Sequence, residues 1–160
     1  MSARQSVLSL VPALRRGEAL RRGGYRTQVE FLEFVIDGVR FGEALQQRDG
    51  GATVMSDLVS VLVPSWPDGF LERQVQRLLG KAPAELADGR LALYVCPECG
   101  DLGCGAVTVA VRRTGNEVVW TDPGWQTDYE PDVEDFEGLG PFRFERRQYD
   151  TLLTTLLRRD

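Results

Sequence analysis

The chain contains no histidine and only one lysine, Lys81, among its 160 residues. Histidine is the commonest general base near neutral pH, so its absence excludes a Ser-His-Asp or Cys-His catalytic device within the chain. A Schiff-base mechanism would have a single candidate lysine, and no motif surrounds it. The sequence also lacks the glycine-rich signatures of nucleotide-binding loops and the G-x-S-x-G motif of serine hydrolases.

Long apolar runs are absent as well. No stretch approaches the roughly 20 apolar residues that a membrane-spanning helix requires. The N-terminal segment SVLSLVPAL is apolar, but its arginine pair follows it, whereas the charge of a secretory signal precedes the apolar core. We therefore predict a cytoplasmic protein with no membrane contact. With 42% hydrophobic and 27% charged residues, the composition is typical of a folded globular domain.

The net charge of −5 is unevenly distributed. Residues 1–26 contain six arginines and one glutamate, a charge of +5, so the remaining residues carry −10. The first segment also contains Pro12, which interrupts a helix, and the pair Gly23–Gly24. We predict that residues 1–26 form a basic, flexible N-terminal extension and that residues 27–160 form a single domain. Because this domain is acidic, we expect no nucleic-acid partner.

Strand-like sequences dominate the predicted domain. The segment TQVEFLEFVIDGVRF is rich in aromatic and β-branched residues and predicts a hairpin with a type I′ turn at Asp37–Gly38. Apolar residues occupy both odd and even positions before this turn, so we expect both faces of the strand to be covered. Alternating sequences farther along predict an antiparallel meander, with strands within residues 87–96, 106–113 and 117–122. Shorter strands are expected at residues 58–63 and 142–144.

Two segments have the apolar spacing of helices. Residues 70–79 predict one helix, and Gly80 follows where a helix commonly ends. The clearest apolar stripe is C-terminal and consists of Tyr149, Leu152, Leu153, Leu156 and Leu157. Because such a stripe must be buried, we predict an α+β fold. It combines an antiparallel sheet, made of the hairpin and the meander, with a C-terminal amphipathic helix and a second helix packed on it.

All three cysteines, Cys96, Cys99 and Cys104, lie between the first two meander strands. An odd number cannot form a complete set of disulfides, and a reducing cytosol favours free thiols, metal-bound thiolates or a transient redox pair. Free cysteines pack as small hydrophobic side chains. A hairpin loop is not the helix N-terminus that lowers the thiol pKa in Cys-x-x-Cys redox pairs. These considerations favour a structural loop, with metal binding and redox chemistry as the alternatives.

The sequence CPECG, residues 96–100, resembles the C-P-x-C-G knuckle of zinc-ribbon and rubredoxin-type proteins. The resemblance implies that Cys96 and Cys99 are metal ligands, with zinc as the metal and Cys104 as a third ligand. A structural zinc site takes four protein ligands, and the chain has no histidine to supply the fourth. Glu98, Asp101 or a partner chain are the remaining candidates. The resemblance covers ten residues.

Residues 121–138 form a second unusual stretch, TDPGWQTDYEPDVEDFEG, with seven carboxylates, three aromatic residues and no cation. One interpretation is a solvated surface loop. The other is a docking surface, because clustered carboxylates attract a basic partner and aromatic residues supply binding energy at interfaces. The candidate partner-binding residues are Trp125, Asp128, Tyr129, Glu130, Asp132, Glu134 and Asp135.

Two hypotheses for function follow. The first is a small acidic interaction protein without catalytic activity, which docks a basic protein partner through this acidic aromatic loop and needs no cofactor. In size and charge such a protein resembles bacterial immunity proteins. The second is a metal-binding or thiol-dependent, oxidoreductase-like protein that uses the cysteine loop. We favour the first, because the second lacks a fourth metal ligand and a general base.

Overall fold

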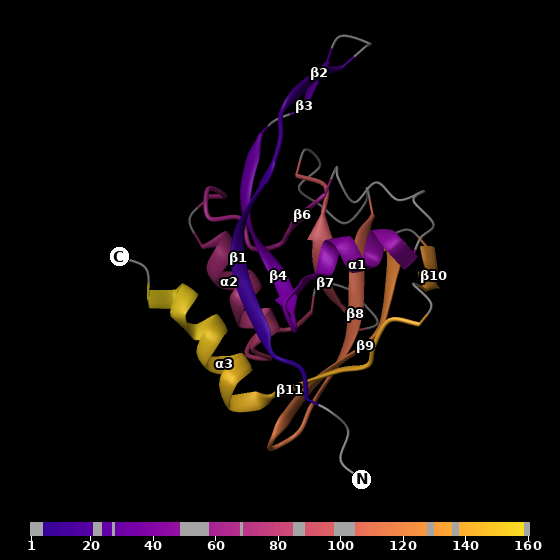
Figure 1. Ribbon diagram of the computed structural model, residues 1–160. Coiled ribbons are helices and arrows are strands. Elements are labelled where there is room, and N and C mark those ends of the chain that lie inside the picture. The colour runs from indigo at the N-terminus through magenta and orange to yellow at the C-terminus, as the bar shows by residue number, and fades with distance from the viewer. Residues whose placement is uncertain are drawn as a thin grey trace.

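The computed structural model describes the backbone of residues 5–20, 24–26, 28–48, 58–67, 69–84, 89–97, 105–127, 130–135 and 138–158. Antiparallel sheets and three α-helices make up this part of the chain, which confirms the α+β class. In Figure 1 the sheets curve around a common interior, helices flank them, and a two-stranded ribbon rises away from the body. No helix within the described ranges is both long and apolar enough to cross a membrane.

The larger sheet has six strands in the order β10–β9–β8–β7–β6, with β11 also paired to β9. Its central strands β7, β8 and β9 form the antiparallel meander that the sequence predicts. The strands are β6 (Val59–Ser60), β7 (Leu91–Val95), β8 (Ala106–Arg113), β9 (Glu117–Thr127), β10 (Glu130–Asp135) and β11 (Phe142–Glu145). The predicted strand at residues 142–144 is thus confirmed, whereas only two residues of the segment 58–63 are in a regular strand.

The smaller sheet has the order β1–β4–β5. Asp37 and Gly38 both have positive φ, 52° and 83°, as a type I′ turn requires, so the predicted hairpin between β4 and β5 is confirmed. Two short strands, β2 and β3, pair with each other farther along the same ribbon. The bounds are β1 (Leu8–Arg15), β2 (Glu18–Leu20), β3 (Gly24–Arg26), β4 (Val29–Ile36) and β5 (Val39–Arg40).

Backbone hydrogen bonds join the two main sheets into a closed circuit. On one side, the Leu32 N–H of β4 donates to the Leu62 carbonyl at 2.9 Å, next to β6. On the other side, the Ser6 N–H, just before β1, donates to the Arg143 carbonyl of β11 at 2.6 Å. The order is therefore β1, β4, β6, β7, β8, β9 and β11, and then β1 again. The molecule is a partly closed barrel, which leaves few free strand edges.

The interior of the barrel is filled by aromatic side chains. Trp120 of β9 is fully buried and makes edge-to-face contacts with Phe34 of β4, Phe144 of β11 and Tyr149. Tyr94 of β7 also packs edge-on against Phe34, with 5.9 Å between the ring centroids. Both faces of β4 are largely covered, as its sequence predicts, because Phe31 packs in a second cluster with Val59 and Val63.

The N-terminal segment differs from expectation. The prediction that residues 1–26 form an extension outside the domain is wrong for residues 8–15. These residues form β1, which pairs with β4 along its whole length from Leu8↔Ile36 to Arg15↔Val29. Leu8 is fully buried and Arg15 is 5% exposed. Pro12 is compatible with this strand because β1 is at an edge of its sheet, where a missing N–H costs no ladder hydrogen bond.

Three helices pack on the sheets: α1 (Phe41–Arg48), α2 (Phe70–Leu78) and α3 (Arg146–Thr154), with a 3₁₀ turn after α3 at Thr155–Arg158. Both predicted helices are confirmed. The short helix α1 is not predicted, because its eight residues place only Phe41 and Leu45 at a helical interval among the large apolar residues. Both of these side chains are nevertheless buried in the core.

The C-terminus of α2 is closed by a Schellman motif. The Lys81 N–H donates to the Gln76 carbonyl at 2.8 Å, the Gly80 N–H donates to the Arg77 carbonyl at 3.0 Å, and Gly80 has φ 76°. The carbonyl of Leu78 accepts a hydrogen bond from the buried Tyr149 hydroxyl of α3 at 3.0 Å. This bond fixes the two helices against each other and satisfies a carbonyl that the helix itself leaves open.

Leu153 lies mid-stripe on α3, and its side chain is fully buried in the main core. We expect Leu153→Ala to lower the free energy of unfolding by about 2–5 kcal/mol, because it removes buried apolar surface and leaves a cavity. Thr151→Ala, at an exposed position on the same helix, is the matched control. The measurement is a urea melt of each variant. A loss under about 1 kcal/mol for Leu153→Ala would mean that α3 packs only peripherally.

Candidate functional site

A groove of about 500 Å³ lies where the two-stranded ribbon meets the body. Its walls come from β1, β4, the end of β5 and the segment that follows β6. They are mostly apolar, and Leu14 remains 48% exposed there. The lining residues are Pro12, Ala13, Leu14, Glu30, Phe31, Leu32, Arg40 and Pro64. A pocket of this volume is within the range that binds small molecules or short peptide segments.

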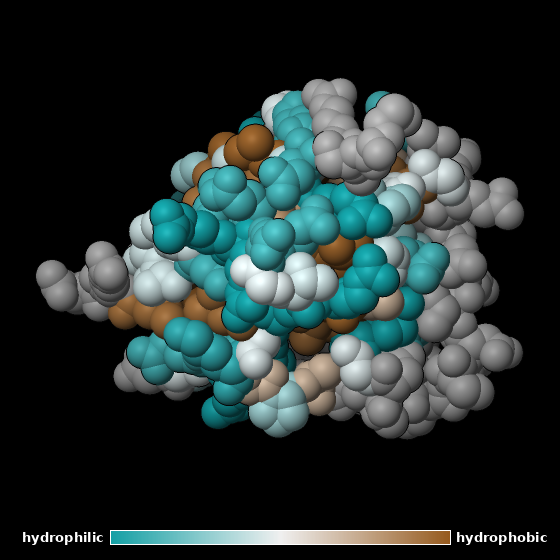
Figure 2. Space-filling model, turned by 90° about the horizontal axis from the view of Figure 1, so that it is seen from below, coloured by the Kyte–Doolittle hydropathy of each residue, from teal (hydrophilic) through white to brown (hydrophobic). Residues whose placement is uncertain are grey.

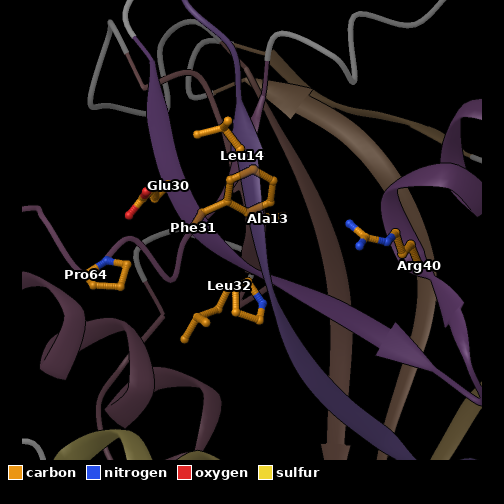
Figure 3. A pocket seen from close by; sticks show the side chains of 8 residues that line it. Ala13, Leu14, Glu30, Phe31, Leu32, Arg40 and Pro64 are labelled. Atoms are coloured by element: carbon orange, nitrogen blue, oxygen red, sulfur yellow. The ribbon is translucent and has the colours of Figure 1, made fainter.

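The groove carries one charge of each sign. In Figure 3 Glu30 and Arg40 lie on opposite sides of the paired strands β1 and β4. The register agrees, because Arg40 is opposite Val35, and Val35 and Glu30 point to opposite faces of β4. Both charged residues are exposed. Within the part of the chain that the structure describes, neither forms an ion pair with another side chain.

Next to the groove, a buried carboxyl group lies in a gap between strands. Glu33 of β4 is 7% exposed, and its Oε1 accepts the Phe34 N–H at 2.8 Å and the Tyr94 hydroxyl. Along this edge of β4 the backbone hydrogen bonds to neighbouring strands are interrupted. The interruption lies between Leu32, whose N–H donates to the Leu62 carbonyl, and Val35, which pairs with Arg40 of β5. The carboxyl therefore takes the place of a strand carbonyl and satisfies a backbone donor that would otherwise be buried without a partner.

Burial raises the pKa of Glu33, because desolvation disfavours the charged form. The hydrogen bonds from Tyr94 and Phe34 and the nearby charge of Arg40 oppose this shift. Burial and the charge of Glu33 also raise the pKa of Tyr94 well above its ordinary value, so Tyr94 stays protonated and remains the donor in the pair. Glu33 is recognisable from the sequence as a carboxylate in a largely apolar strand. Its partner Tyr94 could not be identified from the sequence.

A second buried polar cluster lies at a bulge between β8 and β9. The register shifts between Thr108 and Ala110, and Asp122 has φ 51°. The Arg90 guanidinium donates to the carbonyls of Thr108, at 3.0 Å, and Asp122, and also to the side chain of Gln126. Arg90 thus satisfies carbonyls that the bulge removes from the ladder. Because its donors are engaged in this way, we assign it a structural role.

In the described part of the acidic aromatic segment, residues 121–127 belong to β9 and residues 130–135 form β10, and these strands pair in antiparallel fashion, whereas the sequence predicts a loop. Trp125 lies on β9, and Glu130, Asp132, Glu134 and Asp135 lie on β10, which is the terminal strand of the larger sheet. Trp125 is partly buried, and its ring covers Gly105, where an added Cβ would come within 2.1 Å of the ring. The positions of Asp128 and Tyr129 are outside the described residues.

The cysteine loop joins β7 to β8, as predicted. Cys96 directly follows β7, is partly buried and packs against the main core. Cys99 and Cys104, and the candidate ligands Glu98 and Asp101, are outside the described residues. Among the residues that are described, no group of three or more Cys, Asp or Glu side chains is arranged to hold a metal ion. The zinc site therefore stays a prediction.

Hydrophilic residues cover most of the middle of the lower face shown in Figure 2, and hydrophobic residues appear there only in small separate areas among those that are coloured. Comparison of the chain with protein-family models, curated proteins and solved structures found no match.

Proposed function

We propose that the chain is a small acidic interaction protein that docks a basic protein partner at β10. The observation that carries the proposal is the position of β10 at the end of the larger sheet. Four of its six residues are carboxylates. An edge strand can accept a further strand through its backbone, and clustered carboxylates favour a basic one.

The surroundings of β10 support this proposal. In the register of the hairpin, Trp125 of β9 is opposite Glu134 of β10, so an aromatic residue adjoins the acidic strand. Residues 121–138 contain no cation to neutralise their seven carboxylates. A basic partner would relieve their mutual repulsion, accelerate association and make binding sensitive to salt.

The test uses a labelled ten-residue peptide of alternating lysine and valine as the probe, with binding followed by fluorescence anisotropy at several salt concentrations. We expect binding that weakens as salt increases. Neutralising Glu130, Asp132 and Glu134 to the corresponding amides should reduce the affinity about tenfold or more and flatten the salt dependence.

A matched variant controls for net charge. Neutralising Glu43, Glu72 and Glu145, which are exposed and lie on or beside helices, changes the net charge by the same amount, from −5 to −2. This control should bind the probe nearly as well as the unmodified protein. Equal loss of binding in both variants would show that the probe responds only to the net charge of the protein. That result would count against a docking site at β10.

A further inference from the structure

We propose that the basic partner of β10 is a second copy of this chain, whose projecting arm, residues 16–26, pairs with the outer edge of β10. The inference rests on the docking site proposed above at β10 and names the partner for it. The arm is the outer end of the ribbon and contains β2 and β3. The two surfaces that meet are therefore both encoded in this sequence.

The first argument is that the arm is an isolated pair of strands. In the described part of the chain, β2 and β3 pair with each other and form a sheet of their own, separate from the two main sheets. In Figure 1 they project beyond the body, past the ends of β1 and β4. A two-stranded antiparallel unit is only marginally stable in water, and each of its outer edges can accept a further strand. An edge strand of another molecule would supply a third strand.

The second argument is charge complementarity. Residues 16–26 contain four arginines and one glutamate, a charge of +3, so the rest of the chain carries −8. β10 has four carboxylates and no cation, and it is the last strand of the larger sheet among the described residues. Contact between the arm and β10 brings opposite charges together and relieves the repulsion within each segment. A nucleic acid would also offer the arm negative charge, but the −8 of the remaining chain would repel it.

The third argument is that the arm lies away from β10 of its own chain. In Figure 1 the arm rises from the top of the molecule, whereas β10 lies at the side, next to β9. The arm continues β1 and β4, whose pairing over eight residues sets its direction. The β10 strand that it meets therefore belongs to another molecule. Each molecule has one arm and one β10, so two molecules can exchange arms about a twofold axis, and the assembly then closes.

The experiment measures the mean mass of the full-length protein by sedimentation equilibrium at low and high salt. Contacts between short strands bury little surface, so association should be weak and should become visible between about 10 µM and about 1 mM protein. At low salt we expect the mean mass to rise above that of one chain. This rise should disappear at about 1 M salt, where charges are screened beyond about 3 Å. A monomer at every concentration in low salt would overturn the proposal.

Two charge-reversed variants locate the contact. The arm variant replaces three arginines by glutamate and has a net charge of −11, and the strand variant replaces three carboxylates of β10 by lysine and has a net charge of +1. Each should remain monomeric, because its arm and its β10 carry charge of the same sign. The substitutions are Arg16→Glu, Arg22→Glu and Arg26→Glu in the first variant, and Glu130→Lys, Asp132→Lys and Glu134→Lys in the second.

A chain with all six substitutions provides the decisive comparison. Its net charge returns to −5, that of the unmodified protein, while the signs on the arm and on β10 are exchanged. We expect it to associate again in low salt. A folded six-substitution variant that stays monomeric would overturn the proposal. If this variant does not fold, an equimolar mixture of the arm and strand variants replaces it, because each arm then meets a β10 of opposite charge. A mixture without association would overturn the proposal in the same way.

A matched control keeps the net charge of the arm variant but leaves the arm unchanged. Arg73→Glu, Arg112→Glu and Arg147→Glu reverse three exposed arginines on α2, β8 and α3, and the net charge is again −11. This control should associate at concentrations where the arm variant stays monomeric. Equal loss of association in both would show that repulsion between whole molecules is responsible and would count against the arm as the contact.

The lysine–valine probe separates this inference from the proposal for β10 itself. A monomeric chain that binds the probe would retain docking at β10 and would exclude a second copy as the partner. Where the chain does associate, saturating probe should return it to a monomer, since the probe and the arm occupy the same strand edge. Association that persists with the probe bound would overturn the assignment of the arm to β10.

Discussion

A chain that lacks residues 1–24 is expected to remain unfolded. The deletion removes β1, the complete ladder that β1 forms with β4, and the fully buried Leu8 side chain. It also removes the hydrogen bond from Ser6 to Arg143 that closes the barrel. One face of β4 would then expose apolar residues to water and one edge would lose its hydrogen-bond partners. Dispersion of amide signals in a proton–nitrogen NMR spectrum and near-ultraviolet circular dichroism provide the measurement.

Two substitutions separate the effect of β1 packing from that of chain length. Leu8→Ala should lower the free energy of unfolding by about 2–5 kcal/mol, because Leu8 is fully buried. Leu14→Ala removes the same atoms from an exposed position on the same strand and should change it by less than about 0.5 kcal/mol. A truncated chain with native-like spectra would contradict the structure and would restore the interpretation of these residues as an extension.

The second large effect is expected at Glu33. In Glu33→Ala both the Phe34 N–H and the Tyr94 hydroxyl lose their acceptor inside the protein. Each buried group left unsatisfied costs about 1–3 kcal/mol, so the total loss should be several kcal/mol. Glu33→Gln is the matched control, since an amide oxygen can accept both hydrogen bonds while carrying no charge. We expect this variant to fold normally.

The same pair of proteins predicts a pH dependence. The pKa of Glu33 is raised in the folded protein, so the folded state binds this proton more tightly than the unfolded state does. Its contribution to stability is therefore fully present below the unfolded pKa, about 4.5, and is lost as the pH rises through the folded pKa. Urea melts from pH 4 to pH 8 should show Glu33→Gln gaining stability relative to the unmodified protein over this interval. A constant difference across the interval would contradict a raised pKa.

The sequence predicted the elements whose periodicity is local. The meander, the β4–β5 hairpin and the helices α2 and α3 all have alternating or helical apolar patterns with turn residues at their ends. It did not predict β1, because Pro12 and the neighbouring arginines are typical of a terminus. Nor did it predict β10, since its carboxylates and Pro131 are typical of a loop. Both strands lie at sheet edges, where these residue types are tolerated.

The candidate sites depend on contacts between distant parts of the chain, and the sequence could not indicate them. Glu33 and Tyr94 are 61 positions apart, and the groove combines residues of β1, β4 and β5 with Pro64. The alternation of β4 shows that Glu33 shares a face with apolar residues, but it does not identify the donor opposite. Burial, and with it the direction of the pKa shift, follows only from the packed structure.

The bond between Ser6 and Arg143 has a consequence for how the protein is made. β1 is synthesised long before β11, and the ring of strands cannot close until β11 has been made. During translation the ribbon of β1 and β4 can form early from local pairing, but most of the aromatic interior is contributed later by β7, β9 and β11. The apolar face of β4 thus remains uncovered for most of synthesis. Such a nascent chain depends on rapid completion, or on a chaperone, to avoid association through that face.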